Sequence, residues 1–124
     1  LAFRAAGAQN GRVTVNDLLN LNFKKGSLVF LASCDTNSVL NGEGLVSLAW
    51  GMMVAGSTTV ISAQWEANDR STGAISESFY KRYKTGVSSA EALQRASIDM
   101  IRNKSSESHE PYYWAAFTIS GDFR

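Results

Sequence analysis

The chain has 124 residues, of which 44% are hydrophobic and 19% are charged, and its net charge is +1. This length and composition predict one soluble globular domain with a small hydrophobic core. The basic residues are scattered, which excludes a basic nucleic-acid-binding face, and no apolar run is long enough for a membrane-spanning helix.

The N-terminal quarter predicts short elements that lead into a buried strand. Residues 1–4 read as a strand, residues 7–11 as a turn, and residues 14–20 as a short helix that begins at its threonine. Residues 28–32 are apolar on both faces, which predicts a central strand covered on each side. Because the chain has no initiator methionine and opens as if within a strand, we expect it to be a piece of a longer protein.

A helix and a second strand are predicted next. A glycine-rich turn at 41–44 leads into a helix that Gly56 terminates as a left-handed cap. The core-facing stripe of this helix is Leu45, Leu48, Ala49, Met52 and Met53. Residues 57–64 are rich in β-branched side chains and predict a strand. A strand, helix and strand in this order predict a parallel pair joined by a crossover.

Two helices and a last strand complete the predicted fold. The first helix is capped by Asn68 or Asp69 and ends near Lys84, with Ile75, Phe79 and Tyr83 on its core face. The second helix opens with a capping-box pattern at 88–91. Its predicted core stripe is Leu93, Ala96 or Ser97, Met100 and Ile101.

After a polar loop at 103–110, residues 114–119 predict the last strand. Two helices in series return the chain to the side it left, so this strand should run antiparallel to its neighbour. Its first residues should then lie at the carboxyl edge of the parallel pair. The fold class is α/β, with a mostly parallel sheet and a reversed last strand.

Cys34 is the single cysteine and follows the predicted strand at 28–32. The carboxyl edge of a parallel sheet is where ligands and nucleophiles gather in α/β folds, and a thiolate there can attack a carbonyl carbon. The alternative is a small buried hydrophobe at a strand end. One unpaired thiol also fits a reducing compartment, and we expect a cytoplasmic protein.

His109 is the single histidine, but it is a poor partner for this thiol. If the last strand is antiparallel, His109 lies two strands away from Cys34, on the order of 10 Å. That separation is too large for a general base, so we expect an exposed loop histidine. One cysteine and one histidine so far apart in sequence also lack a zinc spacing, and we expect no metal and no cofactor.

Four blocks resemble the C-terminal part of a CHAT domain, a family of caspase-like cysteine peptidases related to separase. They are LVFLASCDTN, NGEGLVSLAWGMMVAGSTTVISAQWEANDRST, GVSSAEALQRASIDMI and PYYWAAFTISGD. The resemblance implies a caspase-like three-layer sandwich, present in part over residues 1–124. It also implies that Cys34 is the catalytic nucleophile, with a protein or peptide as substrate.

The same resemblance assigns substrate contacts to Asp35, Trp65 and Asp69, which match the segments that border the groove in this family. Asp35 would pair with a basic side chain, or it is a turn residue that bonds its own backbone. Asp69 is alternatively the N-cap of its helix.

The resemblance also implies that part of the machinery is outside this chain. The family's catalytic histidine and the first three strands precede the point at which the chain begins, so the N-terminal half of the same domain is an expected partner. Tetratricopeptide repeats are often attached to such domains and are a second expected partner in the parent. The fragment by itself should be an inefficient peptidase.

Two other classes of function compete with a cysteine endopeptidase. One is a catalytically inactive caspase-like scaffold that binds protein partners. The other is a plain α/β binding module with a buried thiol. A histidine upstream of Leu1 would favour the enzyme, and rapid alkylation of Cys34 in the folded protein would argue against the module.

Overall fold

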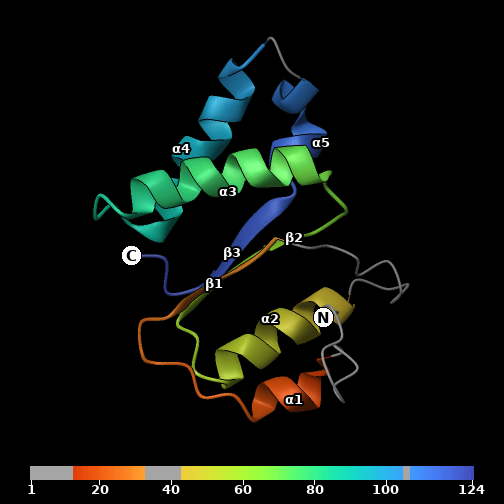
Figure 1. The fold of residues 1–124 in the computed structure, drawn as a ribbon, viewed down its shortest axis with the longest axis vertical. Helices are drawn as coiled ribbons and strands as arrows, with labels where there is room; N and C mark the ends of the chain where they lie inside the picture. Colours follow the sequence, from red (N-terminus) through yellow and green to blue (C-terminus); the bar gives the residue numbers. More distant parts are fainter. Residues whose placement is uncertain (1–12, 33–42, 105–106) are drawn as a thin grey trace, which may run out of the picture.

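The computed structural model describes residues 13–32, 43–104 and 107–124. The elements predicted at 1–4 and 7–11, and the beginning of the turn at 41–44, lie outside these residues. The described chain is a mixed α/β unit in which a sheet lies between two layers of helices (Figure 1). None of the helices in these three ranges is long and apolar enough to cross a membrane.

Within the described residues the sheet has three strands in the order β1-β2-β3. They are β1 (Leu28–Leu31), β2 (Thr59–Ala63) and β3 (Phe117–Gly121). β1 and β2 are parallel, and β3 runs antiparallel to β2. Both orientations confirm the predictions. β2 is the central strand of this sheet, while β1 pairs with β2 alone among the described strands.

Side chains alternate between the two faces of the sheet. Val60 packs against the helices of one layer, whereas Ile61 and Ala63 pack against the other. All five residues of β2 are buried, as expected for a strand covered on both sides. β1 also has cover on each side, because Leu28 and Phe30 contact one core and Val29 and Leu31 the other.

The layer on the Val60 side consists of α1 (Val15–Leu19) and α2 (Glu43–Val54) (Figure 1). Thr14 caps α1 through a reciprocal capping box, in which its side chain accepts from the Asp17 N–H. Leu48, Ala49 and Met52 of α2 are buried as predicted. Met53 was predicted to share their stripe and is exposed, so that assignment is wrong.

The opposite layer consists of α3 (Asp69–Tyr83) and α4 (Ser89–Arg102) (Figure 1). The side chains of Asn68 and Ser88 cap these helices by accepting main-chain N–H bonds three residues later. The predicted core residues of both helices are buried or half-buried, except Ile101, which is exposed. Ala96, rather than Ser97, is the buried alternative.

The segment before β3 differs from its prediction. The polar loop contains the 3₁₀ helix η1 (Glu107–His109), and α5 (Pro111–Trp114) follows it. The strand predicted at 114–119 therefore begins three residues later, at Phe117, and Trp114 is helical. The reason is Pro111, whose fixed φ favours the first position of a helix and outweighs the strand preference of the aromatic residues after it.

Candidate functional site at the carboxyl edge of the sheet

The carboxyl ends of β1 and β2 lie side by side. Leu31 is level with Ser62, and Ala63 is level with Phe117 at the start of β3. The end of β1, the end of β2 and the beginning of β3 therefore meet at one edge of the sheet. The segment that carries Cys34 and Asp35 follows β1 in the sequence, and both residues lie outside the described part of the chain.

Trp65 lies two residues beyond the end of β2, as the sequence predicted. Its indole Nε1–H donates to the main-chain oxygen of Tyr112 at 2.8 Å, and the Tyr112 hydroxyl donates to the Glu66 main-chain oxygen at 2.6 Å. The two rings also contact each other, with centroids 6.4 Å apart. The half-buried Trp65 thus joins the segment after β2 to α5, and its role in substrate binding stays a prediction.

Asp69 is the first residue of α3 and is exposed. The cap of this helix is Asn68, whose Oδ1 accepts from the Ser71 N–H at 2.8 Å. The alternative in which Asp69 is the N-cap is therefore wrong. A carboxylate in the first turn is favoured by the helix dipole, which gives Asp69 a modest structural role without a cap. Its contact with substrate remains a prediction.

His109 ends η1 and is exposed. Its Nε2 lies 3.3 Å from Glu110 Oε1. Because β2 separates β3 from β1, the histidine segment stands two strands away from the strand that leads to Cys34. Because Cys34 lies outside the described residues, the expectation that His109 is not the base for that thiol stays a prediction.

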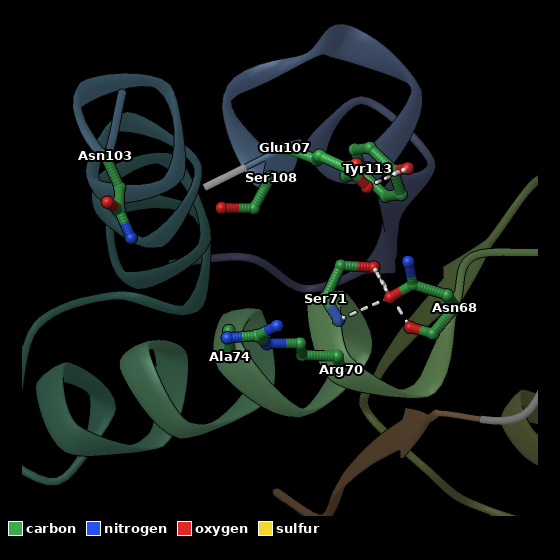
Figure 2. A pocket seen from close by; sticks show the side chains of 8 residues that line it. All are labelled: Asn68, Arg70, Ser71, Ala74, Asn103, Glu107, Ser108 and Tyr113. Atoms are coloured by element: carbon green, nitrogen blue, oxygen red, sulfur yellow. Dashed lines mark hydrogen bonds between the residues drawn. The ribbon is translucent and has the colours of Figure 1, made fainter. Parts of the chain in front are cut away.

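A polar cavity of about 510 Å³ lies between the start of α3, the end of α4, η1 and α5. Figure 2 shows its walls, with Arg70 on α3, Asn103 at the end of α4, and Glu107 and Tyr113 opposite them. The remaining lining residues are Asn68, Ser71, Ala74 and Ser108. Of the predicted site residues that the structure describes, neither Trp65 nor Asp69 lines this cavity, although Asp69 stands between two residues that do.

Tyr113 lines this cavity and has a shifted pKa. Loss of hydration and the nearby Glu107 carboxylate raise the pKa of Tyr113 above its usual value of 10.0. The Tyr113 hydroxyl donates to Glu107 Oε2 at 3.4 Å, which is a long contact and therefore a weak one. The tyrosine remains a neutral hydrogen-bond donor at physiological pH, so the charged side chains among the described lining residues are those of Arg70 and Glu107.

Over residues 13–32, 43–104 and 107–124, no three His, Cys, Asp or Glu side chains gather closely enough to hold a metal ion. The described part of the edge offers hydrogen-bond donors, aromatic surface and the Arg70 and Glu107 charges. Groups of these kinds can form hydrogen bonds and ion pairs with a bound ligand.

Sequence reasoning missed Tyr112 and the cavity. Tyr112 is 47 positions from Trp65, and nothing in the local pattern of either residue indicates their contact. Pro111 was the available signal, because a proline after a polar loop marks a helix start and would have placed the aromatic residues in a turn of helix.

The family model for the CHAT domain matches residues 1–122. Tetratricopeptide repeat protein 28 of Mus musculus is 28% identical over 109 residues, which cover 88% of this chain and 4% of that protein. The Homo sapiens protein of the same name is 25% identical with the same coverage. No solved structure matches. The chain thus spans a small fraction of these curated relatives, and it belongs to the CHAT domain family, which is caspase-like.

Proposed function

We propose that this chain supplies the nucleophile of a cysteine endopeptidase, with Cys34 as the attacking residue. The observation that carries the proposal is the parallel pairing of β1 and β2, whose carboxyl ends share one edge. Cys34 follows the last residue of β1, Leu31, by three positions in the sequence. A thiol just beyond such an edge is in the part of an α/β fold that binds ligands.

The reaction begins with the transfer of the Cys34 proton to a histidine. The thiolate then attacks the scissile carbonyl carbon, and the amine leaves with that proton as the thioester forms. Water hydrolyses the thioester and restores the thiol. The main-chain N–H of Cys34 helps to hold the oxyanion. The histidine comes from the N-terminal half of the same domain, since His109 belongs to a segment two strands away.

The edge strand β1 supports the proposal that further strands belong to this sheet. Its residues are apolar on both faces, with Phe30 against Phe79 and Phe117 on one side. Among the described strands it pairs with β2 alone. An apolar strand with an unpaired edge is a hazard that folded proteins cover. Pairing with the N-terminal half would complete a caspase-like three-layer sandwich.

Three residues would contact the substrate near the nucleophile. Asp35 would pair with a basic side chain next to the scissile bond, since a carboxylate and a guanidinium or ammonium group attract each other strongly when partly desolvated. Trp65 and Asp69 would border the groove, because both follow the end of β2 within six residues. The substrate would be a protein or peptide. Because thiols stay reduced in the cytoplasm, the parent would be a cytoplasmic protein.

The parent protein also carries tetratricopeptide repeats in this proposal. The support is the name of the two relatives, Tetratricopeptide repeat protein 28, of which this chain matches 4%. The repeats would bind partners or substrates and present them to the peptidase.

The test is performed on the full-length parent with Cys34→Ala and with His109→Gln as a matched control. Cys34→Ala should abolish both cleavage of the protein substrate and labelling by an electrophilic ketone probe. His109→Gln should leave the rate within about twofold of the unchanged protein, because the residue lies away from the nucleophile segment. Retention of cleavage by Cys34→Ala would overturn the assignment. A labelled but non-cleaving parent without an upstream histidine would favour the inactive scaffold.

A further inference from the structure

The cavity between α3, α4, η1 and α5 has walls of unlike charge. Arg70 in the first turn of α3 supplies a guanidinium, and Glu107 on η1 supplies a carboxylate on the opposite wall (Figure 2). Within the described residues neither of these two side chains belongs to an ion pair. Both charges are therefore available to a ligand.

The helix ends at the cavity have the same polarity as these two side chains. α3 begins at the wall that carries Arg70, and the N-terminus of a helix has a partial positive charge. α4 ends at Arg102, next to the lining residue Asn103, and the C-terminus of a helix has a partial negative charge. The cavity is therefore positive at the start of α3 and negative at the end of α4 and at Glu107.

The rest of the lining is uncharged and mostly polar. Of the described lining residues, Ala74 alone has no polar group in its side chain. Such walls disfavour an apolar ligand, because the polar groups would lose water without gaining hydrogen bonds. Glu107 and the end of α4 would repel a simple anion, whereas Arg70 and the start of α3 would repel a simple cation. A molecule that carries both charges avoids both repulsions.

The cavity is accessible and large enough for such a molecule. Its volume of about 510 Å³ lies within the range of about 300–1,000 Å³ that is typical of small-molecule sites. Of the described lining residues, Ser71 alone is buried, and the others are exposed or half-buried. A solute can therefore reach the charged side chains from water.

The N-terminal half of the domain is not the expected occupant of this cavity. Its strands would join the sheet beside β1, at one end of the strand order. α5, which forms part of the cavity wall, leads into β3 at the other end of that order. The cavity therefore lies away from the edge at which the N-terminal half would join.

We propose that this cavity binds a small polar zwitterion with the charges of a free amino acid. The ligand carboxylate would pair with the Arg70 guanidinium at the start of α3, and the ligand ammonium group would pair with the Glu107 carboxylate. Asn103 and Ser108 line the space that would hold a polar side chain. The inference concerns binding alone, so it does not rest on the peptidase proposal.

The test is a ligand-observed NMR titration of the full-length parent with L-glutamine, and with L-asparagine and L-serine as further probes. L-Glutamine should bind with a dissociation constant of about 1 mM or tighter, an affinity reasonable for so small a molecule at an open site. Two analogues of L-glutamine keep its amide and lack one charge each. Glutaramic acid has no ammonium group, and 4-aminobutanamide has no carboxylate. Each analogue should bind about fivefold more weakly or worse.

Variants of the two charged residues assign the binding to this cavity. Arg70→Gln should remove the preference for L-glutamine over 4-aminobutanamide, because the carboxylate no longer has a cation to contact. Glu107→Gln should remove the preference for L-glutamine over glutaramic acid. A merely distorted cavity would instead weaken all three probes together, which would contradict the assignment. Arg95→Gln and Glu77→Gln, at exposed positions outside the cavity, are matched controls that should leave binding unchanged.

The proposal is overturned if L-glutamine, L-asparagine and L-serine all fail to bind the parent. It is also overturned if binding is unchanged in both Arg70→Gln and Glu107→Gln, since the ligand would then bind elsewhere in the parent. Tighter binding of glutaramic acid than of L-glutamine would indicate an anion site and would contradict the zwitterion. Cys34→Ala should bind L-glutamine as the unchanged parent does, so this proposal and the peptidase proposal can fail separately.

Discussion

Trp65 and Tyr112 hold the two chain segments at the carboxyl edge of the sheet together. The indole N–H of Trp65 donates to the Tyr112 main-chain oxygen, and the Tyr112 hydroxyl reaches back to the Glu66 main-chain oxygen. Both bonds cross between the segment after β2 and α5, so the position of the predicted groove residue depends on an aromatic partner far away in the sequence.

Trp65→Phe keeps a ring at this position and removes the N–H donor. The free energy of unfolding should fall by about 0.5–1.5 kcal/mol, the usual net value of one hydrogen bond. Tyr112→Phe removes the other bond and should cost a similar amount. Urea unfolding of both single variants and the double variant measures these losses. A Trp65→Phe variant as stable as the unchanged chain would show that the indole bond contributes nothing.

The packing of α3 against α4 includes a small polar network. Arg82 Nη2 lies 2.6 Å from Asp99 Oδ2, and the Ser78 hydroxyl donates to the same oxygen at 2.8 Å. Both charged side chains are partly exposed, so solvent screens the pair. A double-mutant cycle with Arg82→Met and Asp99→Asn should give a coupling energy of up to about 1 kcal/mol.

The pair of Glu91 and Arg95 is the matched control for that cycle, because it lies within one turn of α4 and joins no second element. Its coupling should be about 0.3–0.5 kcal/mol, typical of a helical i,i+4 pair. Added salt should reduce both couplings. Equal couplings for the two pairs would mean that the bridge between helices gives no extra stability.

The local signals in the sequence predicted most element boundaries, because they act over a few residues. Asn68 and Ser88 begin their helices through side-chain bonds to the next turn, and Gly56 ends α2 with a φ of +101°. These interactions need no tertiary structure. The parallel and antiparallel pairing followed from chain topology.

The errors in the predicted core have one geometric cause. Met53 and Ile101 were each assigned to a stripe as the residue eight positions after its first member, Leu45 and Leu93. Eight residues rotate about 80° around a helix of 3.6 residues per turn, so such a position lies at the border of the buried face. Whether it is covered depends on the neighbouring layer, which the pattern within one helix does not contain.

The candidate site was less accessible to sequence reasoning than the fold. Cys34 and Asp35 were assigned through a family resemblance, and they lie outside the described residues. The cavity between Arg70 and Glu107 needs four elements to meet, and no short motif encodes that meeting.

The capping box of α1 should make the stability depend on acid. The Thr14 main-chain N–H and hydroxyl both donate to the Asp17 carboxylate at 2.7 Å, and they hold the pKa of Asp17 below its usual value of 3.8. A lowered pKa means that the folded state favours the carboxylate. Its contribution is therefore present above about pH 3.8 and is lost as the pH falls through the lowered pKa.

Asp17→Asn removes this titration and keeps a hydrogen-bond acceptor. The urea midpoint of the unchanged chain should exceed that of the variant at neutral pH. The difference between the two midpoints should shrink as the pH falls through the lowered pKa of Asp17. Unfolding curves of both proteins over the acid range measure it. A difference that stays constant through the acid range would contradict the role assigned to the charge.

The last residue of β3, Gly121, should be the glycine least tolerant of substitution among those of the described chain with positive φ. Its φ is +98°, and a Cβ there would collide with the Thr58 main-chain oxygen, which accepts the Asp122 N–H at 2.9 Å. Gly86 is the matched control, because its φ is +89° and a Cβ there meets nothing within 4 Å.

Gly86→Ala should cost about 1–2 kcal/mol, the penalty for a left-handed residue with a side chain. Gly121→Ala should carry the same penalty plus about 1–3 kcal/mol for the collision, because the opposing atom is backbone and β2 cannot move away. Urea unfolding compares the two variants directly. Equal losses would mean that β3 shifts to accommodate the methyl group. The pairing of Gly121 with Thr59 would then not be the contact that fixes the position of β3 in the sheet.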